Sequence, residues 1–297
     1  MSDAEVSLDP EPIEFPGTGG ITLRGDRWTG AGWEKLPDVM MLPGGGQTRH
    51  SWKTAGLELA RRGFRVTSMD TRGHGDSDWS PQADYDITTL AADAIGVIRA
   101  LGRPTVLVGA SMGGLTGILA APQVGPEHLC ALVLVDVVPR VERGGSARIH
   151  QFMVGGLDGF ETLDEAADAI AAYLPHRPRP KNNDGLLRNL RKREDGRWYW
   201  HWDPAFVTQP REVGPIERVA EMQRAAASIT VPVLLLRGKL SDIVSDEGVE
   251  EFRALVPQVE VVVLPRAAHT AAGDDNEAFA AAVIDFVSGP VIRSQIG

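Results

Sequence analysis

The sequence predicts an α/β fold in which helices cover both faces of a mostly parallel sheet and a helical segment is inserted between two strands. In the first and last parts of the chain, short apolar runs alternate with amphipathic helical segments. Such runs are typical of strands that are buried on both faces. Residues 139–228 contain mainly helical patterns instead. We therefore expect a core made of residues 1–138 and 229–297 and a helical cap, or lid, made of residues 139–228.

The composition restricts the classes of function. The chain has 297 residues, 43% of them hydrophobic, and a net charge of −10, which disfavours nucleic acid as a partner. It has no apolar run long enough to span a bilayer, and its acidic beginning lacks the features of a signal peptide. We therefore expect a cytoplasmic protein that does not associate with membranes. The single cysteine, Cys130, heads an apolar run and is expected to pack in the core.

The first elements are three strands and a glycine-rich loop. Residues 11–14 and 21–28 are strand-like runs separated by a turn, which predicts a hairpin. The apolar run 38–42 predicts a strand that ends in Pro43-Gly44-Gly45-Gly46. Three successive glycines after a strand indicate a close approach of the backbone to another group, although a flexible loop is the alternative. A phosphate-binding P-loop is disfavoured because the Gly-Lys-Ser/Thr ending of such loops is missing.

A helix over residues 57–62 and a strand over 64–69 precede the charged turn Asp70 to Asp78. His74 and its neighbouring aspartates are metal-ligating residue types, but their spacing fits no zinc pattern. We expect a turn that is stabilised by its own hydrogen bonds and no metal. The next predicted helix, 88–101, is ended by Gly102.

The most informative stretch is Gly109-Ala110-Ser111-Met112-Gly113, which joins the apolar run 105–108 to a short apolar helix. Glycines two residues to either side of a serine let a strand turn sharply into a helix, and this turn exposes the hydroxyl group. The helix N-terminus behind the serine can stabilise negative charge on a substrate oxygen. We interpret Ser111 as a nucleophile, with a Gly/Ser-rich turn without chemistry as the alternative.

The predicted cap contains four helical segments and eight aromatic residues. The helices are expected around residues 147–154, after the capping box Thr162 to Glu165, near 184–193 and near 216–226. Candidates for an apolar substrate pocket are Gly46, Tyr173, Trp198, Trp200 and Trp202. Packing of the cap against the core is the alternative role of these aromatic residues.

A serine nucleophile needs a base and an acid that orients the base. Of the seven histidines, His269 follows the predicted strand 259–264, where a parallel sheet brings loop residues close to Ser111. Asp242 follows the preceding strand, 231–236, and is the preferred acid. Asp136, at the end of the apolar run 132–138, is the alternative acid.

The glycine loop 44–46 is predicted to supply part of an oxyanion site. An oxyanion that forms during acyl transfer is held by two backbone N–H groups, one from the residue after the nucleophile and one from the loop after an earlier strand. These donors are predicted to be Met112 and Gly45. Gly44 and Gly46 are alternatives to Gly45, because a small shift of the loop exchanges them.

Together these motifs resemble the α/β-hydrolase superfamily, in particular its capped bacterial serine esterases, haloperoxidase-like perhydrolases and proteins labelled epoxide hydrolases. The resemblance covers nearly the whole chain: residues 44–46, the turn 70–77 with its pattern D-x-R-G-H-G-x-S, the elbow at Ser111, the turn 238–242 and the loop of His269. It implies an eight-stranded sheet and no cofactor. Pro43 departs from the family, which usually has histidine there, and Arg266-Ala267-Ala268 replaces a commoner glycine-containing stretch.

A serine at the elbow favours acyl chemistry. Attack of Ser111 on an epoxide carbon would leave an ether that is not readily cleaved, so Tyr173 and Tyr199 are interpreted as packing or pocket residues. The hypothesis is a carboxylesterase-like serine hydrolase of small to medium carboxylic esters or lactones, acting through an acyl-enzyme as a monomer or small homo-oligomer. Thioesterase, carbon–carbon hydrolase or perhydrolase activity with the same residues, and a ligand receptor on a hydrolase scaffold, are the alternatives.

Overall fold

A computed structural model of the chain describes residues 7, 9–175, 179, 182–210, 213–265, 267–269 and 276–289. Its centre is an eight-stranded sheet with the strand order β1-β2-β4-β3-β5-β6-β9-β10. The strands of this sheet are β1 (Glu11–Pro16), β2 (Thr22–Thr29), β3 (Asp38–Leu42), β4 (Arg65–Met69), β5 (Thr105–Ala110), β6 (Leu129–Val135), β9 (Val233–Gly238) and β10 (Val259–Leu264). From β4 to β10 in this order all neighbours are parallel, whereas β2 is antiparallel to both β1 and β4. The predicted sheet and its opening hairpin are confirmed.

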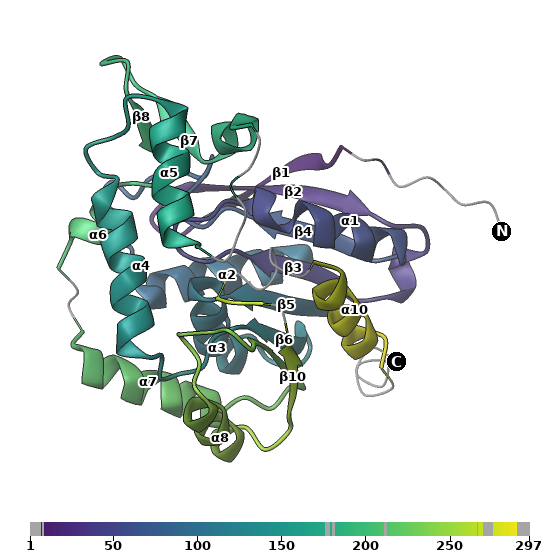
Figure 1. Cartoon of the computed structure of the whole chain (residues 1–297). Coiled ribbons are helices and arrows are strands. Elements are labelled where there is room, and N and C mark those ends of the chain that lie inside the picture. Colours follow the sequence, from purple (N-terminus) through teal and green to yellow (C-terminus); the bar gives the residue numbers. More distant parts are fainter. Residues whose placement is uncertain are drawn as a thin grey trace.

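Helices cover both faces of this sheet (Figure 1). They are α1 (Lys53–Arg61), α2 (Ile87–Leu101), α3 (Met112–Val124), α4 (Arg143–Gly155), α5 (Leu163–Tyr173), α6 (Ala205–Thr208), α7 (Pro215–Ala227), α8 (Asp246–Leu255) and α10 (Asn276–Val287), with short 3₁₀ helices η1 (Trp33–Lys35), η2 (Arg49–Trp52) and η3 (Asp184–Arg188). In β5, Leu107 packs with α2, α3, α7 and α8 on one face, while Val106 and Val108 pack with α1 and α10 on the other. Because both faces are buried, the central strands are apolar throughout.

Local signals in the core formed the expected structures. Asp86 caps α2 by accepting a hydrogen bond from the Thr88 N–H at 2.9 Å, and Gly102 ends the helix at φ 68°. Cys130 is fully buried in β6, and burial raises the pKa of its thiol to about 12. This cysteine is therefore a core residue, as predicted.

The segment for which the sequence predicts a cap, and to which we refer by that name, leaves the sheet after β6 and returns to it at β9 (Figure 1). The capping box forms at α5, where Thr162 Oγ1 accepts a hydrogen bond from the Glu165 N–H at 3.1 Å. Helices α4 and α5 pack around a separate apolar cluster that includes Met153, Phe160 and Trp200. Helix α7 instead packs on α3 and α8 and adds its buried apolar residues to the core below the sheet.

The prediction of a helix near residues 184–193 is wrong. Its first half is η3, and its second half is strand β7 (Leu190–Lys192), which pairs with β8 (Trp198–Trp200) in a small antiparallel hairpin. The turn between them contains Gly196 at φ 82°, whose N–H donates to the Arg193 oxygen at 3.0 Å. The Asp195-Gly196 pair at this turn is a hairpin signal that a helical interpretation of the segment overlooks.

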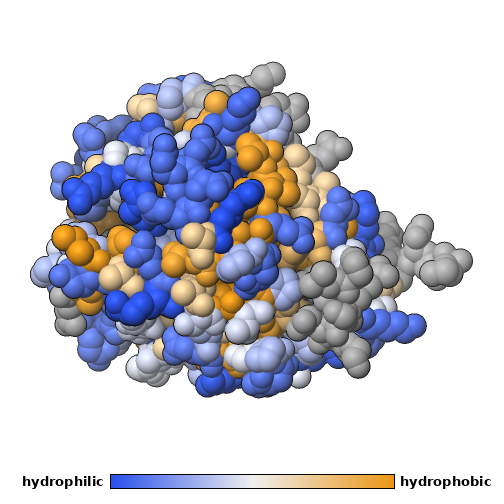
Figure 2. Space-filling model, turned by 90° about the horizontal axis from the view of Figure 1, so that it is seen from below, coloured by the Kyte–Doolittle hydropathy of each residue, from blue (hydrophilic) through white to orange (hydrophobic). Residues whose placement is uncertain are grey.

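The surface carries scattered apolar side chains. Figure 2 shows several hydrophobic patches separated by hydrophilic atoms on the face seen from below. The most exposed large apolar residues include Ile216 and Leu240, which are 75% and 59% exposed. Within the described ranges, no helix is both long enough and apolar enough to cross a membrane.

Candidate active site

The elbow between β5 and α3 places Ser111 at the carboxyl edge of the sheet. Ser111 adopts φ 47° and ψ −113°, a strained conformation for a residue with a side chain. Its N–H donates to the Val135 oxygen of the neighbouring strand at 3.1 Å. A Cβ on Gly109 would clash with the Gly113 backbone oxygen, and a Cβ on Gly113 would clash with the Leu42 oxygen. Both glycines of the motif are thus required by close backbone contacts, as the sequence predicted.

Three side chains from distant parts of the chain meet at this edge. His269 Nε2 lies 3.0 Å from Ser111 Oγ, and His269 Nδ1 lies 2.9 Å from Asp136 Oδ2. They follow three strands of the sheet, β10, β5 and β6. With its proton on Nδ1, a neutral imidazole donates to the carboxylate and accepts at Nε2 from the serine hydroxyl. The arrangement can therefore move a proton from the hydroxyl to the imidazole.

The structure corrects the predicted acid. The Asp242 carboxylate forms an ion pair with Arg148 of α4, with a distance of 2.9 Å between nitrogen and oxygen. In the described part of the chain, the carboxylate that bonds His269 belongs to Asp136 and not to Asp242. The expectation that Asp242 orients the imidazole is therefore wrong, and the alternative acid occupies the position.

The environment of Asp136 explains this outcome. The turn after β9 supplies hydrogen-bond donors to the acid: the Gly238 N–H donates to Asp136 Oδ1 at 3.0 Å, and Ser241 Oγ donates to Oδ2 at 2.6 Å. Strand β6 lies between β5 and β9, so a carboxylate at its end is reached from both sides. Asp136 is fully buried and adopts φ 51°, a strained backbone like that of Ser111.

The glycine loop after β3 lies against the elbow. A Cβ built on Gly44 would sit 3.4 Å from Ser111 Cβ, and one built on Gly45 would sit 3.7 Å from Met112 Sδ. Met112 is the first residue of α3, where backbone N–H groups have no partner within the helix. The loop and the helix start therefore lie on two sides of the serine, as an oxyanion site requires.

The hydrogen bonds of the loop distinguish between its three glycines. The Gly44 N–H donates to Gln47 Oε1 at 3.1 Å, and the Gly46 N–H donates to His74 Nε2 at 3.0 Å. The Gly45 N–H has no hydrogen-bond partner among the residues that the structure describes. Of the three candidates, Gly45 is thus the one whose N–H is free to bind a substrate oxygen.

Two buried histidines also contact this loop, and the sequence did not identify them as site residues. His74 is fully buried and His201 is 2% exposed. Burial lowers the pKa of His74 and lowers that of His201 well below its usual range. The available signals were the position of His74 in the turn motif and that of His201 between two tryptophans. In the described residues no cluster of three or more potential ligands could hold a metal ion.

Side chains of the cap pack against the glycine loop that follows β3. Trp202 is buried, and its ring lies 3.3 Å from the position of a Cβ on Gly46, with Met153 at 3.2 Å. The Phe206 ring lies 3.5 Å from the position of a Cβ on Gly45. Trp202 therefore packs against the loop, and its place in a substrate pocket stays a prediction; Phe206 joins this contact although the sequence did not single it out.

The other predicted pocket residues pack within the cap. Trp200 stacks on Trp202 with ring centroids 5.0 Å apart, and it forms a T-shaped pair with Phe160 in the cap cluster. Tyr173 stacks on Phe152 at 4.3 Å. Trp198 is half-buried on β8, with Lys192 Nζ 5.6 Å from the centre of its ring. The structure thus places these three residues in contacts of the cap itself.

Comparisons with known proteins extend these observations. Residues 39–282 match the model described as "Alpha/beta hydrolase family". The chain is 28% identical to the esterase Rv0045c of Mycobacterium tuberculosis (strain ATCC 25618 / H37Rv) over 89% of this chain and 84% of that protein. It is 29% identical to the sn-1-specific diacylglycerol lipase ABHD11 of Mus musculus, over 85% and 81%. A solved alpha/beta hydrolase from Novosphingobium aromaticivorans DSM 12444 is similar with a TM-score of 0.77 and 28% identity, covering 94% of this chain and 98% of that one.

Proposed function

The chain belongs to the alpha/beta hydrolase family, and on that premise we propose that it is a serine-dependent hydrolase of small to medium carboxylic esters or lactones. The observation that carries this proposal is the continuous contact from Ser111 Oγ through the His269 ring to the Asp136 carboxylate. The relatives named esterase and diacylglycerol lipase support ester bonds as the target.

In the proposed mechanism, Ser111 Oγ attacks the carbonyl carbon while His269 Nε2 accepts the hydroxyl proton. Asp136 stabilises the resulting imidazolium through its bond to Nδ1. The N–H groups of Gly45 and Met112 donate to the negatively charged oxygen of the tetrahedral intermediate. The intermediate collapses, the alcohol leaves with the proton from His269, and an acyl-enzyme remains. Water then repeats the sequence, and the free acid and the serine hydroxyl are released.

Nitrophenyl esters of graded acyl length test this proposal. The native protein is expected to hydrolyse them with saturation kinetics, and Ser111→Ala is expected to lower kcat/KM by at least about 10³-fold, because the nucleophile is lost. A fluorophosphonate probe is expected to label the peptide that contains Ser111. Ser146→Ala, which removes an exposed serine of α4, serves as the matched control. Undiminished turnover in Ser111→Ala, or labelling of another residue, would overturn the proposal.

A further inference from the structure

The backbone of Gly46 is held from two sides by imidazole rings, one from the core and one from the cap. His74 Nε2 accepts a hydrogen bond from the Gly46 N–H at 3.0 Å. His201 Nε2 lies 3.3 Å from the Gly46 oxygen. The two ring centroids are 5.7 Å apart, and both side chains are buried. Gly46 itself adopts φ 75° in a run of three glycines, which has little conformational preference of its own.

The donors around the rings define their tautomers. The Gly75 N–H donates to His201 Nδ1 at 2.6 Å, so the proton of a neutral ring lies on Nε2 and is donated to the Gly46 oxygen. His74 has the opposite tautomer: its Nε2 accepts from Gly46, and its Nδ1–H donates to the Arg72 oxygen at 3.0 Å. A second proton on either ring would face a backbone N–H. Both rings are therefore neutral in this arrangement.

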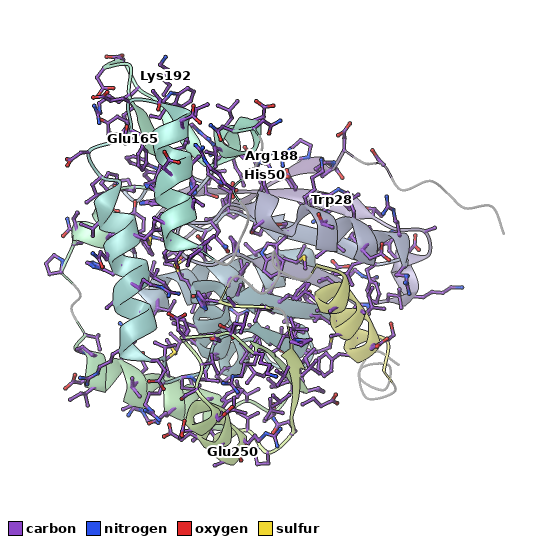
Figure 3. The ribbon with its side chains drawn as sticks, viewed as in Figure 1. Trp28, His50, Glu165, Arg188, Lys192 and Glu250 are labelled. Atoms are coloured by element: carbon purple, nitrogen blue, oxygen red, sulfur yellow. The ribbon has the colours of Figure 1, made fainter. Side chains whose placement is uncertain are left out.

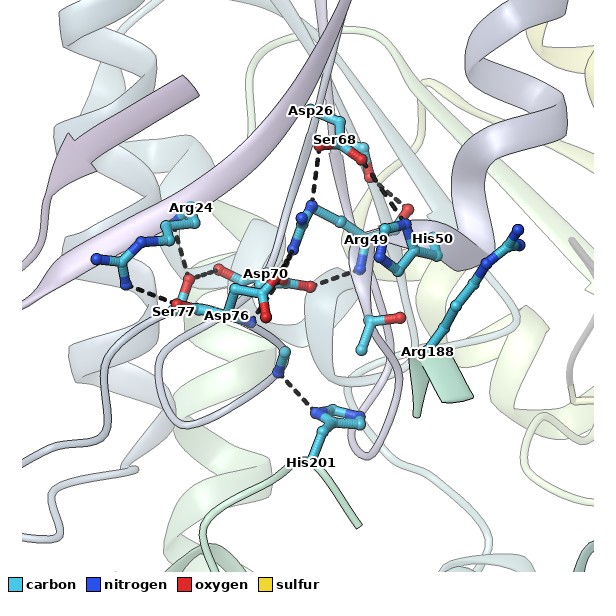
Figure 4. A network of polar contacts seen from close by, with 12 residues as sticks. Arg24, Asp26, Arg49, His50, Ser68, Asp70, Asp76, Ser77, Arg188 and His201 are labelled. Atoms are coloured by element: carbon cyan, nitrogen blue, oxygen red, sulfur yellow. Dashed lines mark hydrogen bonds and ion pairs between the residues drawn. The ribbon is translucent and has the colours of Figure 1, made fainter. Parts of the chain in front are cut away.

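The turn that holds His201 is itself firmly fixed. Asp70 accepts hydrogen bonds from the Asp76 N–H at 3.0 Å and from the Arg49 N–H at 2.6 Å, and its carboxylate is paired with the Arg49 guanidinium. Ser77 Oγ donates a hydrogen bond to the backbone oxygen of Asp70 at 2.8 Å. Figure 4 shows this network and the bond from the turn to the His201 ring. His201 is thus anchored at one nitrogen by rigid core structure and contacts the glycine loop with the other.

Other contacts seat the cap without touching Gly46. Arg191 of β7 pairs with Asp76 at 3.0 Å, and Thr48 Oγ1 donates to Asn189 Oδ1 at 3.3 Å. Arg188 of the cap lies near His50 of the core (Figure 3). Attachment of the cap does not therefore depend on His201 alone, and the effect of His201 on the loop can be separated from cap attachment.

We propose that His74 and His201 are positioning residues that fix the Gly46 backbone and so direct the Gly45 N–H towards the substrate oxygen. The peptide that carries the Gly45 N–H lies between two fixed N–H groups, that of Gly44 bound to Gln47 and that of Gly46 bound to His74. His201 completes this restraint from the cap, so the oxyanion site is complete only when the cap is seated. The inference rests on the proposed function and assigns to the cap a part in the same site.

Two substitutions at one position separate the two bonds of His201. In His201→Gln the side-chain amide can replace Nε2 and still donate to the Gly46 oxygen. In His201→Asn the shorter amide can replace Nδ1 and accept from the Gly75 N–H, but it does not reach Gly46. We expect kcat of ester hydrolysis to fall about tenfold in His201→Asn with KM little changed, less than the 10²–10³-fold loss on removing an oxyanion donor. In His201→Gln we expect kcat within about threefold of native.

A purely structural role of His201 would lower kcat equally in the two variants. The proposal predicts a different pattern. Each variant loses one hydrogen bond, so both are expected to lower the midpoint of thermal unfolding by similar amounts, while only His201→Asn loses kcat and reacts more slowly with the fluorophosphonate. Arg191→Gln is the matched control, because it removes a cap contact to Asp76 but leaves the loop bonds in place. Its kcat is expected to stay within about twofold of native.

Equal losses of kcat in the two His201 variants, or a comparable loss in Arg191→Gln, would show that cap attachment alone is responsible and would overturn the inference. Nitrogen-15 NMR of labelled histidines provides a readout that does not depend on activity. It is expected to show His201 protonated on Nε2 and His74 on Nδ1, and the opposite tautomer at either ring would refute the assignment. If the native protein neither cleaves esters nor reacts at Ser111, the proposed function fails separately, and the tautomers still decide the positioning.

Discussion

At the scale of single residues, we expect substitutions of the two aspartates near the site, Asp136 and Asp242, to have very different effects on kcat. Asp136→Asn keeps the size of the side chain but removes the charge that, in the proposed mechanism, stabilises the imidazolium, and it favours the wrong tautomer of His269. We expect kcat to fall about 10³–10⁴-fold. Asp242→Asn breaks only a partly exposed ion pair with Arg148, and we expect kcat within about threefold of native. Steady-state ester kinetics with thermal unfolding as a folding control measure both, and a larger loss in Asp242→Asn would contradict the assignment.

The sequence supported part of this site because part of it is local. Ser111 lies in a five-residue motif whose glycines are needed for contacts within the elbow. Asp136 and Asp242 both follow apolar strands, and the one local difference, the glycine turn that precedes Asp242, favoured the wrong residue. The choice depends on donors from Gly238 and Ser241, which reach Asp136 across more than a hundred residues of chain. Such contacts appear only when the strands are assembled.

At the scale of elements, the turn from β5 into α3 tolerates no side chain at its second glycine. A Cβ on Gly113 would collide with the Leu42 backbone oxygen. We expect Gly113→Ala to lower the free energy of unfolding by about 1–3 kcal/mol, because the elbow must shift. Urea unfolding of the purified variant measures this change, and ester kinetics show whether Ser111 is displaced.

Gly96→Ala is the matched control for this prediction. Gly96 lies on the exposed side of α2, and a Cβ there would meet no other atom within 4 Å. Alanine favours the helix, so we expect the free energy of unfolding to rise by about 0.5–1 kcal/mol. A destabilised Gly96→Ala, or an unaffected Gly113→Ala, would contradict the packing described for these two glycines.

The long, strongly periodic elements were predictable, whereas the short ones in the cap were not. Helix α5 was marked by a capping box, and α2 by an apolar stripe and a terminal glycine. Strands β7 and β8 have three residues each, too few for an alternating pattern. Their pairing is supported by the aromatic cluster beneath Trp200, which forms only when the cap has folded.

At the scale of the whole molecule, the buried histidines link acidity to stability. In the unfolded chain His74 and His201 titrate near pH 6.5, whereas burial lowers their pKa in the folded protein. As the pH falls below about 6.5 the unfolded chain binds protons that the folded chain excludes. The free energy of unfolding should then fall by up to about 1.4 kcal/mol per pH unit for each ring, with no contribution from these rings above about pH 7.

Urea unfolding at pH 5.5, 6.0 and 7.5 measures this dependence. The charged or titratable groups near the two rings are Asp70, Asp76, Asp203 and Arg191. Burial also lowers the pKa of His50, which therefore contributes to the pH dependence with the same sign. His201→Gln is expected to give a shallower dependence between about pH 5.5 and 6.5, since one titrating ring is gone. An unchanged slope in this variant would show that His201 does not exclude protons in the folded state.

The strands that flank the cap, β6 and β9, are neighbours in the sheet. Along the chain, Ser111 and Asp136 lie before the cap, and His269 lies after it. A chain divided inside the cap would consequently yield two fragments, neither with a complete set of reacting groups, that meet through the pairing of β6 with β9 and the packing of α10 on α1. Such a divided protein could report the encounter of two fused partners, because turnover would begin only once the halves had come together.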